Sequence, residues 1–219
     1  MDVTTVGARI AVFFIPFLFA LCFHEYAHGL VAKWRGDNTA ELAGRLTLNP
    51  MAHIDWIGTV MLPLAAILFN IPVFFGWAKP VPVSSRNLKN PRVDMFWIAL
   101  AGPLSNVLLA VVGALLIGVL IRFFAGASWI MAALEVLKMF ILTNLFLAIF
   151  NAIPLHPLDG GKVLARFLPA SLNYKLEQNE QMTSIILLAL VMTGALRILA
   201  VPVYWIHSGL IQMATYGLM

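Results

Sequence analysis

Long apolar stretches separated by short polar ones run through the whole chain. A helix that crosses a lipid bilayer needs about 20 predominantly apolar residues, and four stretches meet this condition. They predict membrane-spanning helices over about 6–34, 93–124, 129–153 and 182–206. The tail over 207–219 receives no assignment from the pattern. We therefore expect an all-α polytopic membrane protein, a helical bundle that forms one domain over residues 1–219.

A fifth apolar stretch, 56–77, is long enough to cross but is interrupted. Pro63 and the turn Asn70-Ile71-Pro72 break its helical pattern, because proline removes a backbone donor and clashes with the preceding turn. Non-helical backbone at membrane depth must be shielded by protein or by water. The sequence therefore predicts a short re-entrant and extended segment over about 56–83, between the first two full spans.

The composition supports a bilayer as the surroundings of the chain. Hydrophobic residues make up 61% of the sequence and charged residues 11%, which excludes a disordered chain and an ordinary soluble domain. Cys22 is the single cysteine, so no internal disulfide can form. The net charge of +4 is spread over short loops, and we therefore expect no nucleic acid partner.

Basic residues decide the orientation, because Lys and Arg near the ends of spans favour the cytoplasm. If 56–77 dips in and returns, ten basic residues share one side, whereas a full crossing divides them. The ten are Lys33, Arg35, Arg45, Lys79, Arg86, Lys89, Arg92, Lys162, Arg166 and Lys175. The sequence thus predicts a multi-pass protein of the cell membrane with its N-terminus outside. The first stretch lacks a small-residue cleavage site, so we expect it to be retained.

The first predicted span contains three ionisable residues in five positions, His24, Glu25 and His28. Such residues are costly inside a membrane and are functional candidates for that reason. Residues four apart lie on one face of a helix, so His24 and His28 can bind one zinc ion while Glu25 activates a water molecule. The alternative is a hydrogen-bonded polar group between packed helices. The spacing favours a zinc site.

A catalytic zinc ion usually has three protein ligands and one open position, so a third ligand is needed. Asp159 follows the apolar span over 129–153, where Pro154 and Pro157 break the helix and two glycines allow close backbone approach. In the re-entrant topology the chain delivers Asp159 to a depth comparable with that of His28. We therefore predict Asp159 as the third ligand and place the site nearer the cytoplasmic face.

Three segments in this order resemble the site-2 proteases, a family of intramembrane zinc metalloproteases. They are His-Glu-Tyr-Ala-His at 24–28, Ala-Gly-Pro-Leu-Ser-Asn at 101–106 and Asn-Ala-Ile-Pro-Leu-His-Pro-Leu-Asp-Gly at 151–160. The resemblance covers about residues 6–162. It implies membrane helices around one Zn²⁺ per chain, with His24, His28 and Asp159 as ligands and Glu25 as the general base. It further implies cleavage of single-span membrane proteins, by a minimal form without a PDZ or nucleotide-sensing domain.

Four further polar residues are candidates for substrate binding or for support of the metal ligands. Asn106 and Asn151 lie in the family motifs and bind substrate or join helices by hydrogen bonds. His53 is expected to donate to the developing oxyanion or to pair with Asp55 in its own loop. His156 is a partner of Asp159, or a rival ligand if Asp159 points away.

Two segments are candidates for holding a substrate in the extended form that hydrolysis requires. Residues 40–47 and the proline-punctuated 73–83 are predicted to be extended or edge-strand backbone, since Pro80 and Pro82 cannot sit inside a paired strand. Either segment adds a substrate strand by main-chain hydrogen bonds, or both are simply walls of the re-entrant segment.

Two other classes of function use the same residues. A zinc-binding membrane scaffold without protease activity usually lacks the base or a ligand, yet Glu25 and Asp159 are both present. A metal transporter needs acidic or histidine residues along a path across the membrane, whereas here they cluster at one depth. The sequence therefore favours an intramembrane zinc endopeptidase, and it leaves the oligomeric state open.

Overall fold

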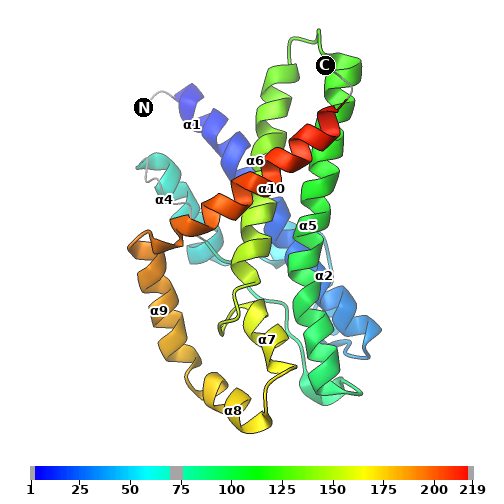
Figure 1. The fold of residues 1–219 in the computed structure, drawn as a ribbon, viewed down its shortest axis with the longest axis vertical. Coiled ribbons are helices and arrows are strands. Elements are labelled where there is room, and N and C mark those ends of the chain that lie inside the picture. Colours follow the sequence, from blue (N-terminus) through cyan, green and yellow to red (C-terminus); the bar gives the residue numbers. More distant parts are fainter. Residues whose placement is uncertain (1–2, 70–75, 217–219) are drawn as a thin grey trace.

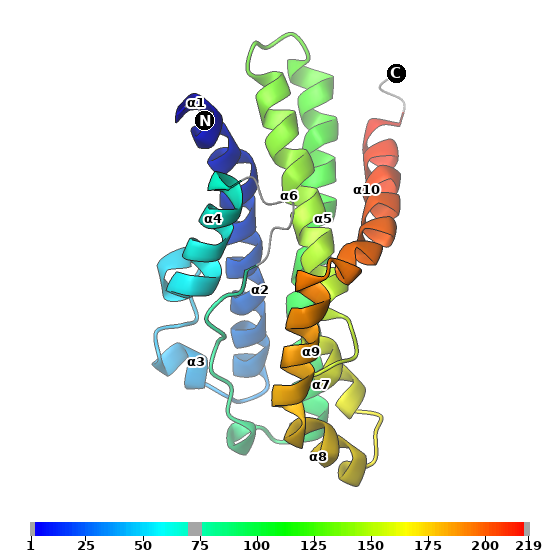
Figure 2. The same ribbon diagram turned by 90° about the vertical axis from the view of Figure 1, so that its left-hand side faces the viewer.

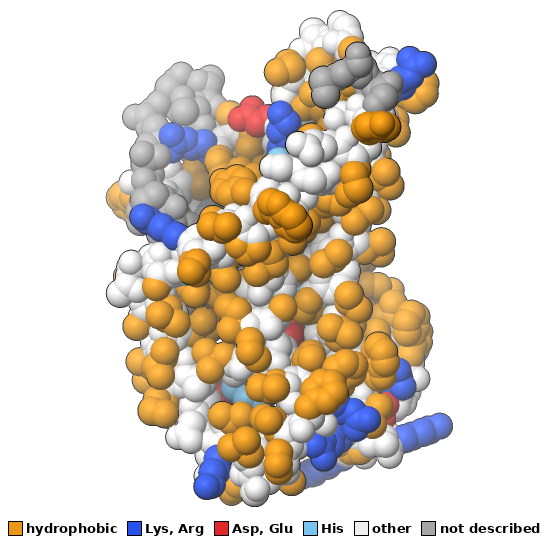
Figure 3. Space-filling view, in the orientation of Figure 1, with side chains coloured by type: hydrophobic (Ala, Val, Ile, Leu, Met, Phe, Trp, Pro, Cys, Tyr) orange, Lys and Arg blue, Asp and Glu red, His pale blue; other side chains and the backbone are white. Residues whose placement is uncertain are grey.

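The protein is a bundle of long helices, described by the computed structural model over residues 3–69 and 76–216 (Figure 1). Four helices are long and apolar enough to cross a membrane: Val6–Trp34, Pro91–Phe124, Ile130–Asn151 and Ala195–Thr215. The described residues contain no β-strand, so the predicted all-α fold class is confirmed. Apolar side chains cover most of the face in Figure 3, and Lys and Arg lie toward its ends, most of them at the lower one.

The first long helix is one rod in three parts. α1 (Val3–Arg9) passes through a π-helical turn (Ile10–Phe14) into α2 (Ile15–Trp34). Pro16 stands at the start of α2, and it has no N–H to continue the ladder and crowds the turn before it. The wider π turn relieves this crowding, and the N–H of Ile15 accordingly bonds to the Ile10 carbonyl. α2 carries the predicted zinc motif.

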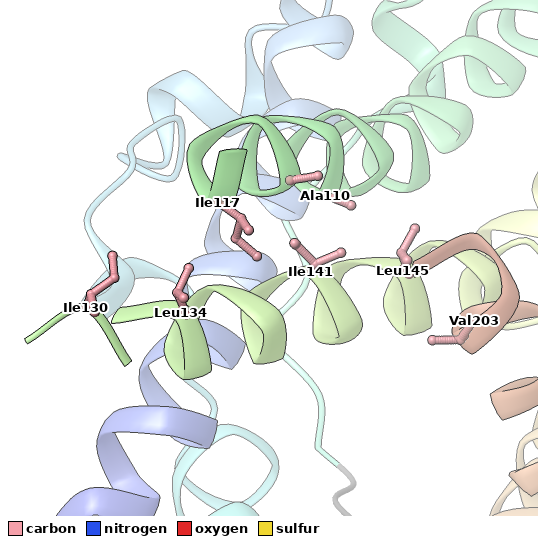
Figure 4. Packing of buried hydrophobic residues seen from close by; sticks show 8 residues of the cluster. Ala110, Ile117, Ile130, Leu134, Ile141, Leu145 and Val203 are labelled. Atoms are coloured by element: carbon pink, nitrogen blue, oxygen red, sulfur yellow. The ribbon is translucent and has the colours of Figure 1, made fainter. Parts of the chain in front are cut away.

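The hydrophobic core joins α5 (Pro91–Phe124), α6 (Ile130–Asn151) and α10 (Ala200–Thr215). Figure 4 shows side chains of α5 facing those of α6, with Val203 of α10 beside Leu145. The buried members are Ala110, Ala114, Ile117, Ile130, Leu134, Ile141, Leu145 and Val203. Small residues let these helices approach closely: Gly113 packs against Ile141, and Gly118 against the backbone of Ala214. Gly113 and Gly118 of α5 thus pack against other helices of the same chain.

The stretch predicted as one span over 182–206 is divided in two, which corrects the sequence prediction. α9 (Glu180–Met192) ends before Gly194, whose φ of 73° is left-handed. Glycine adopts this conformation without steric cost and commonly terminates helices. A short 3₁₀ turn (Ala195–Leu199) then leads into α10, which extends to Thr215 and so includes most of the tail that the sequence left unassigned. Figure 1 shows α10 crossing obliquely in front of α6.

The segment predicted to dip into the membrane is a short helix followed by extended chain. A π-helical turn (Trp56–Met61) continues into α4 (Leu62–Leu68), and together they are shorter than the four long helices. At 1.5 Å per residue they reach about 20 Å, less than the roughly 30 Å of a bilayer core. Residues 70–75 lie outside the described part, and residues 76–84 are extended without strand pairing. α4 lies beside α1 (Figure 2).

Residues 40–47 are not extended, which corrects the first of the two predicted edge segments. α3 (Thr39–Leu42) begins within three residues of Asp37 and is followed by Gly44 with a φ of 66°. The buried Asp37 carboxylate accepts hydrogen bonds from Thr39 and from the Ser84 N–H and Asn87 amide across the chain. Burial alone would raise the pKa of Asp37, but these hydrogen bonds hold its pKa below the usual value. The loop is therefore fixed against 84–87.

Two short helices, α7 (Asp159–Ala165) and α8 (Ala170–Gln178), follow α6 at the lower end of the view in Figure 1. α7 packs against α5. α2 and α6 both run downward in this view, and α5 runs upward. The end of α6 therefore returns the chain to the level at which the lower half of α2 presents its polar residues.

Candidate metal centre and substrate cleft

Three predicted side chains converge between α2 and the start of α7. The Nε2 atoms of His24 and His28 lie 3.1 and 3.2 Å from Oδ2 of Asp159. All three residues are buried, and their ligand atoms lie within 4.8 Å of one another. Within the described residues this is the one group of three or more such side chains close enough to hold a metal ion.

Hydrogen bonds on the far side of each imidazole fix which nitrogen faces the centre. His24 Nδ1 lies 2.6 Å from Oδ1 of Asn106, and His28 Nδ1 lies 2.6 Å from the Ile98 carbonyl. Both partners are acceptors, so each Nδ1 carries the proton and donates it. Each Nε2 then presents a lone pair toward Asp159, which is the tautomer that a metal ligand requires.

A relay of amides across three helices sets the orientation of Asn106. The Asn144 amide N–H donates to the Phe140 carbonyl of its own helix, so the Asn144 oxygen is free to accept from Asn106 Nδ2 at 2.8 Å. Asn106 Nδ2 also donates to the Ala20 carbonyl at 3.1 Å. Its amide oxygen must therefore point toward His24. α2, α5 and α6 are joined through this one buried side chain.

The arrangement fits a zinc ion. Two imidazole lone pairs and a carboxylate oxygen meet at one point, and these acceptors repel one another unless a cation lies between them. Ligand atoms about 2.0 Å from a tetrahedral zinc ion are separated by about 3.3 Å, close to the 3.1 and 3.2 Å found here. Three ligands of this type leave one position for water or substrate.

Glycine and proline in α5 make room for the histidines. A Cβ atom at Gly102 would overlap the rings of His24 and His28, so only glycine allows α5 to pass this close to α2. Pro103 follows inside the helix and cannot donate to the preceding turn. On that same turn the Ile98 carbonyl accepts the His28 proton. The proline and the histidine contact therefore lie close together along α5.

Glycines also return the chain after α6 so that Asp159 faces α2. A side chain at Gly160 would overlap the Ala152 and Ile153 carbonyls, and one at Gly161 would crowd the backbone at His156. The two glycines thus let the first turn of α7 fold onto the end of α6. Asp159, just before them, consequently lies at the depth of the histidines rather than in a surface loop.

Glu25 lies next to the metal-binding group and opens into a cleft of about 1100 Å³. Its Oε2 accepts a hydrogen bond of 2.7 Å from the Val81 N–H, which ties α2 to the extended segment 76–84. The cleft is largely apolar, with walls from α2, the extended segment, α6, α9 and α10. Its polar lining residues include His24, Glu25, His28, Asn151, Asp159 and Lys162.

The four secondary candidates lie in different places. Asn106 contacts His24 and so supports a metal-binding side chain. Asn151 lines the cleft, although its amide also donates to the Leu147 carbonyl of α6. His53 is buried outside the cleft lining and donates from Nε2 to the Thr47 carbonyl. His156 is buried without a hydrogen bond at Nε2 and lines a second pocket, so it does not compete with Asp159 for the centre.

Three residues contribute to the site in ways that the sequence did not indicate. Asn144 orients Asn106, Gly102 makes room for both histidines, and the Val81 N–H holds Glu25. Asn144 had a usable signal, because it is an amide inside a predicted span and such groups seek polar partners. A backbone N–H such as that of Val81 has no residue-type signal at all.

Loss of the Asn106 hydrogen bond is expected to weaken zinc binding about 10- to 100-fold, the usual effect of removing an outer partner of a ligating histidine. Asn106→Ala frees His24 to rotate and to change tautomer, while Asn106→Asp keeps an acceptor at the same place. Zinc affinity measured by competition with a chromogenic chelator tests this. Equal zinc affinity in Asn106→Ala and the wild type would show that Asn106 only joins helices.

A membrane bundle with a buried His, His and Asp centre and a glutamate beside it defines the class of intramembrane metallopeptidases. The model for "Peptidase family M50" matches residues 116–194, which include Asp159. A Bacillus subtilis protein named "Putative zinc metalloprotease YwhC" is 36% identical over 184 residues, covering 82% of this chain and 79% of that protein. "Putative zinc metalloprotease Rip2" of Mycolicibacterium smegmatis is 31% identical over 191 residues, covering 86% and 70%. No solved structure matches the chain.

The chain belongs to peptidase family M50, the site-2 proteases. It is accordingly a zinc metallopeptidase and a multi-pass membrane protein. The resemblance found in the sequence motifs is therefore confirmed, and the zinc cofactor follows from the family.

Proposed function

We propose that the protein is an endopeptidase that cuts transmembrane segments of single-span membrane proteins, using one zinc ion per chain. The observation that carries the proposal is the convergence of His24, His28 and Asp159 in the lining of a largely apolar cleft that also contains Glu25. An apolar wall suits a substrate taken from lipid, and a polar cluster in that wall suits hydrolysis. We accordingly assign His24, His28 and Asp159 as the zinc ligands and Glu25 as the general base.

When bound at this centre, zinc would supply Lewis acidity toward the scissile carbonyl and lower the pKa of a coordinated water. Glu25 accepts the proton of the attacking water and returns it to the leaving amine. One side chain therefore carries out both proton transfers of the hydrolysis. The Val81 N–H holds the other end of the Glu25 carboxylate in place. Asn106 and the Ile98 carbonyl keep the two histidines in the tautomer that leaves Nε2 free.

The extended segment 76–84 is proposed to hold the substrate as an added strand. Two alternate residues of the segment donate their backbone N–H groups to other parts of the chain. The Trp77 N–H donates to the Gly58 carbonyl, and the Lys79 N–H donates to the His53 carbonyl. In extended chain the groups of the residue between them point the opposite way. Ala78 lines the cleft, and its N–H and carbonyl have no partner among the described residues. Pro80, without an N–H, keeps the edge from pairing with its own chain.

Strand addition predicts that N-methylation of the substrate backbone reduces cleavage with a period of two residues. Each N–H that pairs with the enzyme edge loses one hydrogen bond when methylated, which should slow cleavage about tenfold. The intervening N–H groups should tolerate the change. Synthetic single-span peptides methylated one position at a time, reconstituted with the enzyme and analysed by mass spectrometry, give the pattern. Uniform tolerance along the peptide would assign 76–84 to a wall of the cleft.

The orientation proposed from the basic residues puts α7, α8 and the start of α5 at the cytoplasmic side. The metal centre then lies nearer that face, with the N-terminus outside. Co-reconstitution with a panel of single-span model proteins tests the proposed activity directly. Fragments cut within the span are expected from the wild type and not from Glu25→Gln. A wild type that retains zinc and cuts no member of the panel would contradict an intramembrane endopeptidase.

A further inference from the structure

A second pocket, of about 410 Å³, is lined by residues of α7 and α8, two helices at the lower end of the bundle in Figure 1. Its walls come from the start of α5, from α7 with the chain on either side of it, and from α8. Lys162 lines both this pocket and the substrate cleft. The second pocket therefore adjoins the helix that begins with Asp159, and nothing in the proposed hydrolysis uses it.

Three cationic side chains line this pocket, and one of them is already bonded to the backbone. Arg92 donates from Nε to the Arg166 carbonyl at 3.1 Å and from Nη2 to the Leu168 carbonyl. Lys162 and Arg166 form no side-chain hydrogen bond or ion pair within the described part of the chain. Two cations thus border the cavity without an ion pair.

The other polar groups offset this charge only in part. Glu177 is the one acidic residue in the lining, and its Oε1 accepts a hydrogen bond of 2.8 Å from the Asn173 amide. His156 is 7% exposed, and its Nε2 is buried without a hydrogen-bond partner. A buried ring nitrogen without a partner is costly, so a ligand that bonds to it gains more than it would at the surface. The three cations and one acid of the lining therefore leave an excess of positive charge, which favours an anion.

The remaining lining is apolar and points to a lipid as the carrier of that anion. Pro91, Met95, Ala165 and Leu168 are among the wall residues. A free inorganic anion gains nothing from them, whereas the glycerol and upper acyl carbons of a lipid bury against such surface. The pocket also lies at the end of the bundle where most Lys and Arg gather (Figure 3). Basic pockets between helices at this level are known to suit phosphate headgroups.

We propose that this pocket binds the phosphate headgroup of an anionic membrane lipid, with Arg166, Lys162 and His156 as the groups that contact the phosphate. Arg166 supplies a planar fork that matches phosphate oxygens. Arg92 holds the 166–168 backbone in place and adds its charge. The binding is independent of peptide hydrolysis, so its test does not depend on the proposed protease activity.

Native mass spectrometry of the detergent-purified protein tests the proposal. Dioleoyl phosphatidylglycerol and dioleoyl phosphatidylcholine share their acyl chains, so the comparison isolates the headgroup charge. The wild type is expected to retain phosphatidylglycerol about tenfold more strongly than phosphatidylcholine. Arg166→Gln should lower phosphatidylglycerol retention about five- to tenfold, the effect of one cation near the phosphate. Arg86→Gln, the same change at an exposed position outside the pocket, should have no effect.

Arg166→Lys distinguishes the effect of the charge from the effect of side-chain packing, because lysine keeps the positive charge but lacks the planar guanidinium group. Partial retention of phosphatidylglycerol in Arg166→Lys supports the proposal, and a loss equal to that of Arg166→Gln overturns it. Equal loss in Arg86→Gln, or equal binding of the two lipids, also overturns it. Excess inorganic phosphate distinguishes the two sources of a phosphate group: displacement of phosphatidylglycerol supports phosphate recognition, whereas phosphate binding without lipid binding overturns the assignment to a membrane lipid.

Discussion

Replacing Glu25 with Gln is expected to slow peptide cleavage about a thousandfold while leaving the zinc content unchanged. General base catalysis contributes about 10²- to 10⁴-fold to such rates, and an amide cannot accept the proton of the attacking water at neutral pH. The side chain keeps its size and retains an oxygen that can accept the Val81 N–H. The substitution therefore removes the proton acceptor without removing the contact that joins α2 to 76–84.

Cleavage of single-span model proteins in liposomes, with fragments quantified by mass spectrometry, measures this effect. Glu41→Gln is the matched control, because Glu41 is an exposed partner of Lys33 outside the cleft. We expect Glu41→Gln to cleave at the wild-type rate. Full activity in Glu25→Gln would remove Glu25 from the reaction. Loss of zinc in Glu25→Gln would instead mean that Glu25 supports the metal ligands.

The local part of the site was predictable from the sequence because it depends on helix geometry alone. His24 and His28 share a face of α2 as their spacing requires, and both turn Nε2 toward one carboxylate. Asp159 is 131 positions beyond His28, yet it could be selected because two prolines and two glycines mark a break that an apolar span does not otherwise need. The structure brings the three predicted residues together.

Contacts that depend on the packing of distant helices were not predictable in the same way. The relay from Asn144 through Asn106 to His24 requires knowing how α5 crosses between α2 and α6. Likewise, hydropathy is continuous across Gly194, so the pattern gave one span where a single left-handed residue produces two helices. Residues 39–42 form a helical turn, and Asp37 organises that loop through hydrogen bonds.

Replacing Asp159 with Ala is expected to weaken zinc binding more than about a hundredfold, so that the purified variant contains almost no zinc. Loss of an outer hydrogen bond already costs about 10- to 100-fold, and Asp159→Ala removes a ligand together with the only negative charge in the three-residue cluster. Two neutral histidines remain, which is fewer ligands than a catalytic site uses. Metal content by inductively coupled plasma mass spectrometry, under identical purification, gives the result.

A control is needed because removal of any buried carboxylate can destabilise a fold. Asp94→Asn serves this purpose: Asp94 is buried near the start of α5, where it accepts from Arg35 and the Asn90 N–H and takes no part in the centre. Zinc retained in Asp94→Asn and lost in Asp159→Ala assigns the loss to ligation rather than to unfolding. Zinc unaffected by Asp159→Ala would mean that the metal lies elsewhere. Glu25→Gln is expected to keep zinc and lose cleavage, whereas Asp159→Ala is expected to lose zinc. The two variants together therefore distinguish the base from a metal ligand. Neither a silent scaffold nor a transporter would show this difference.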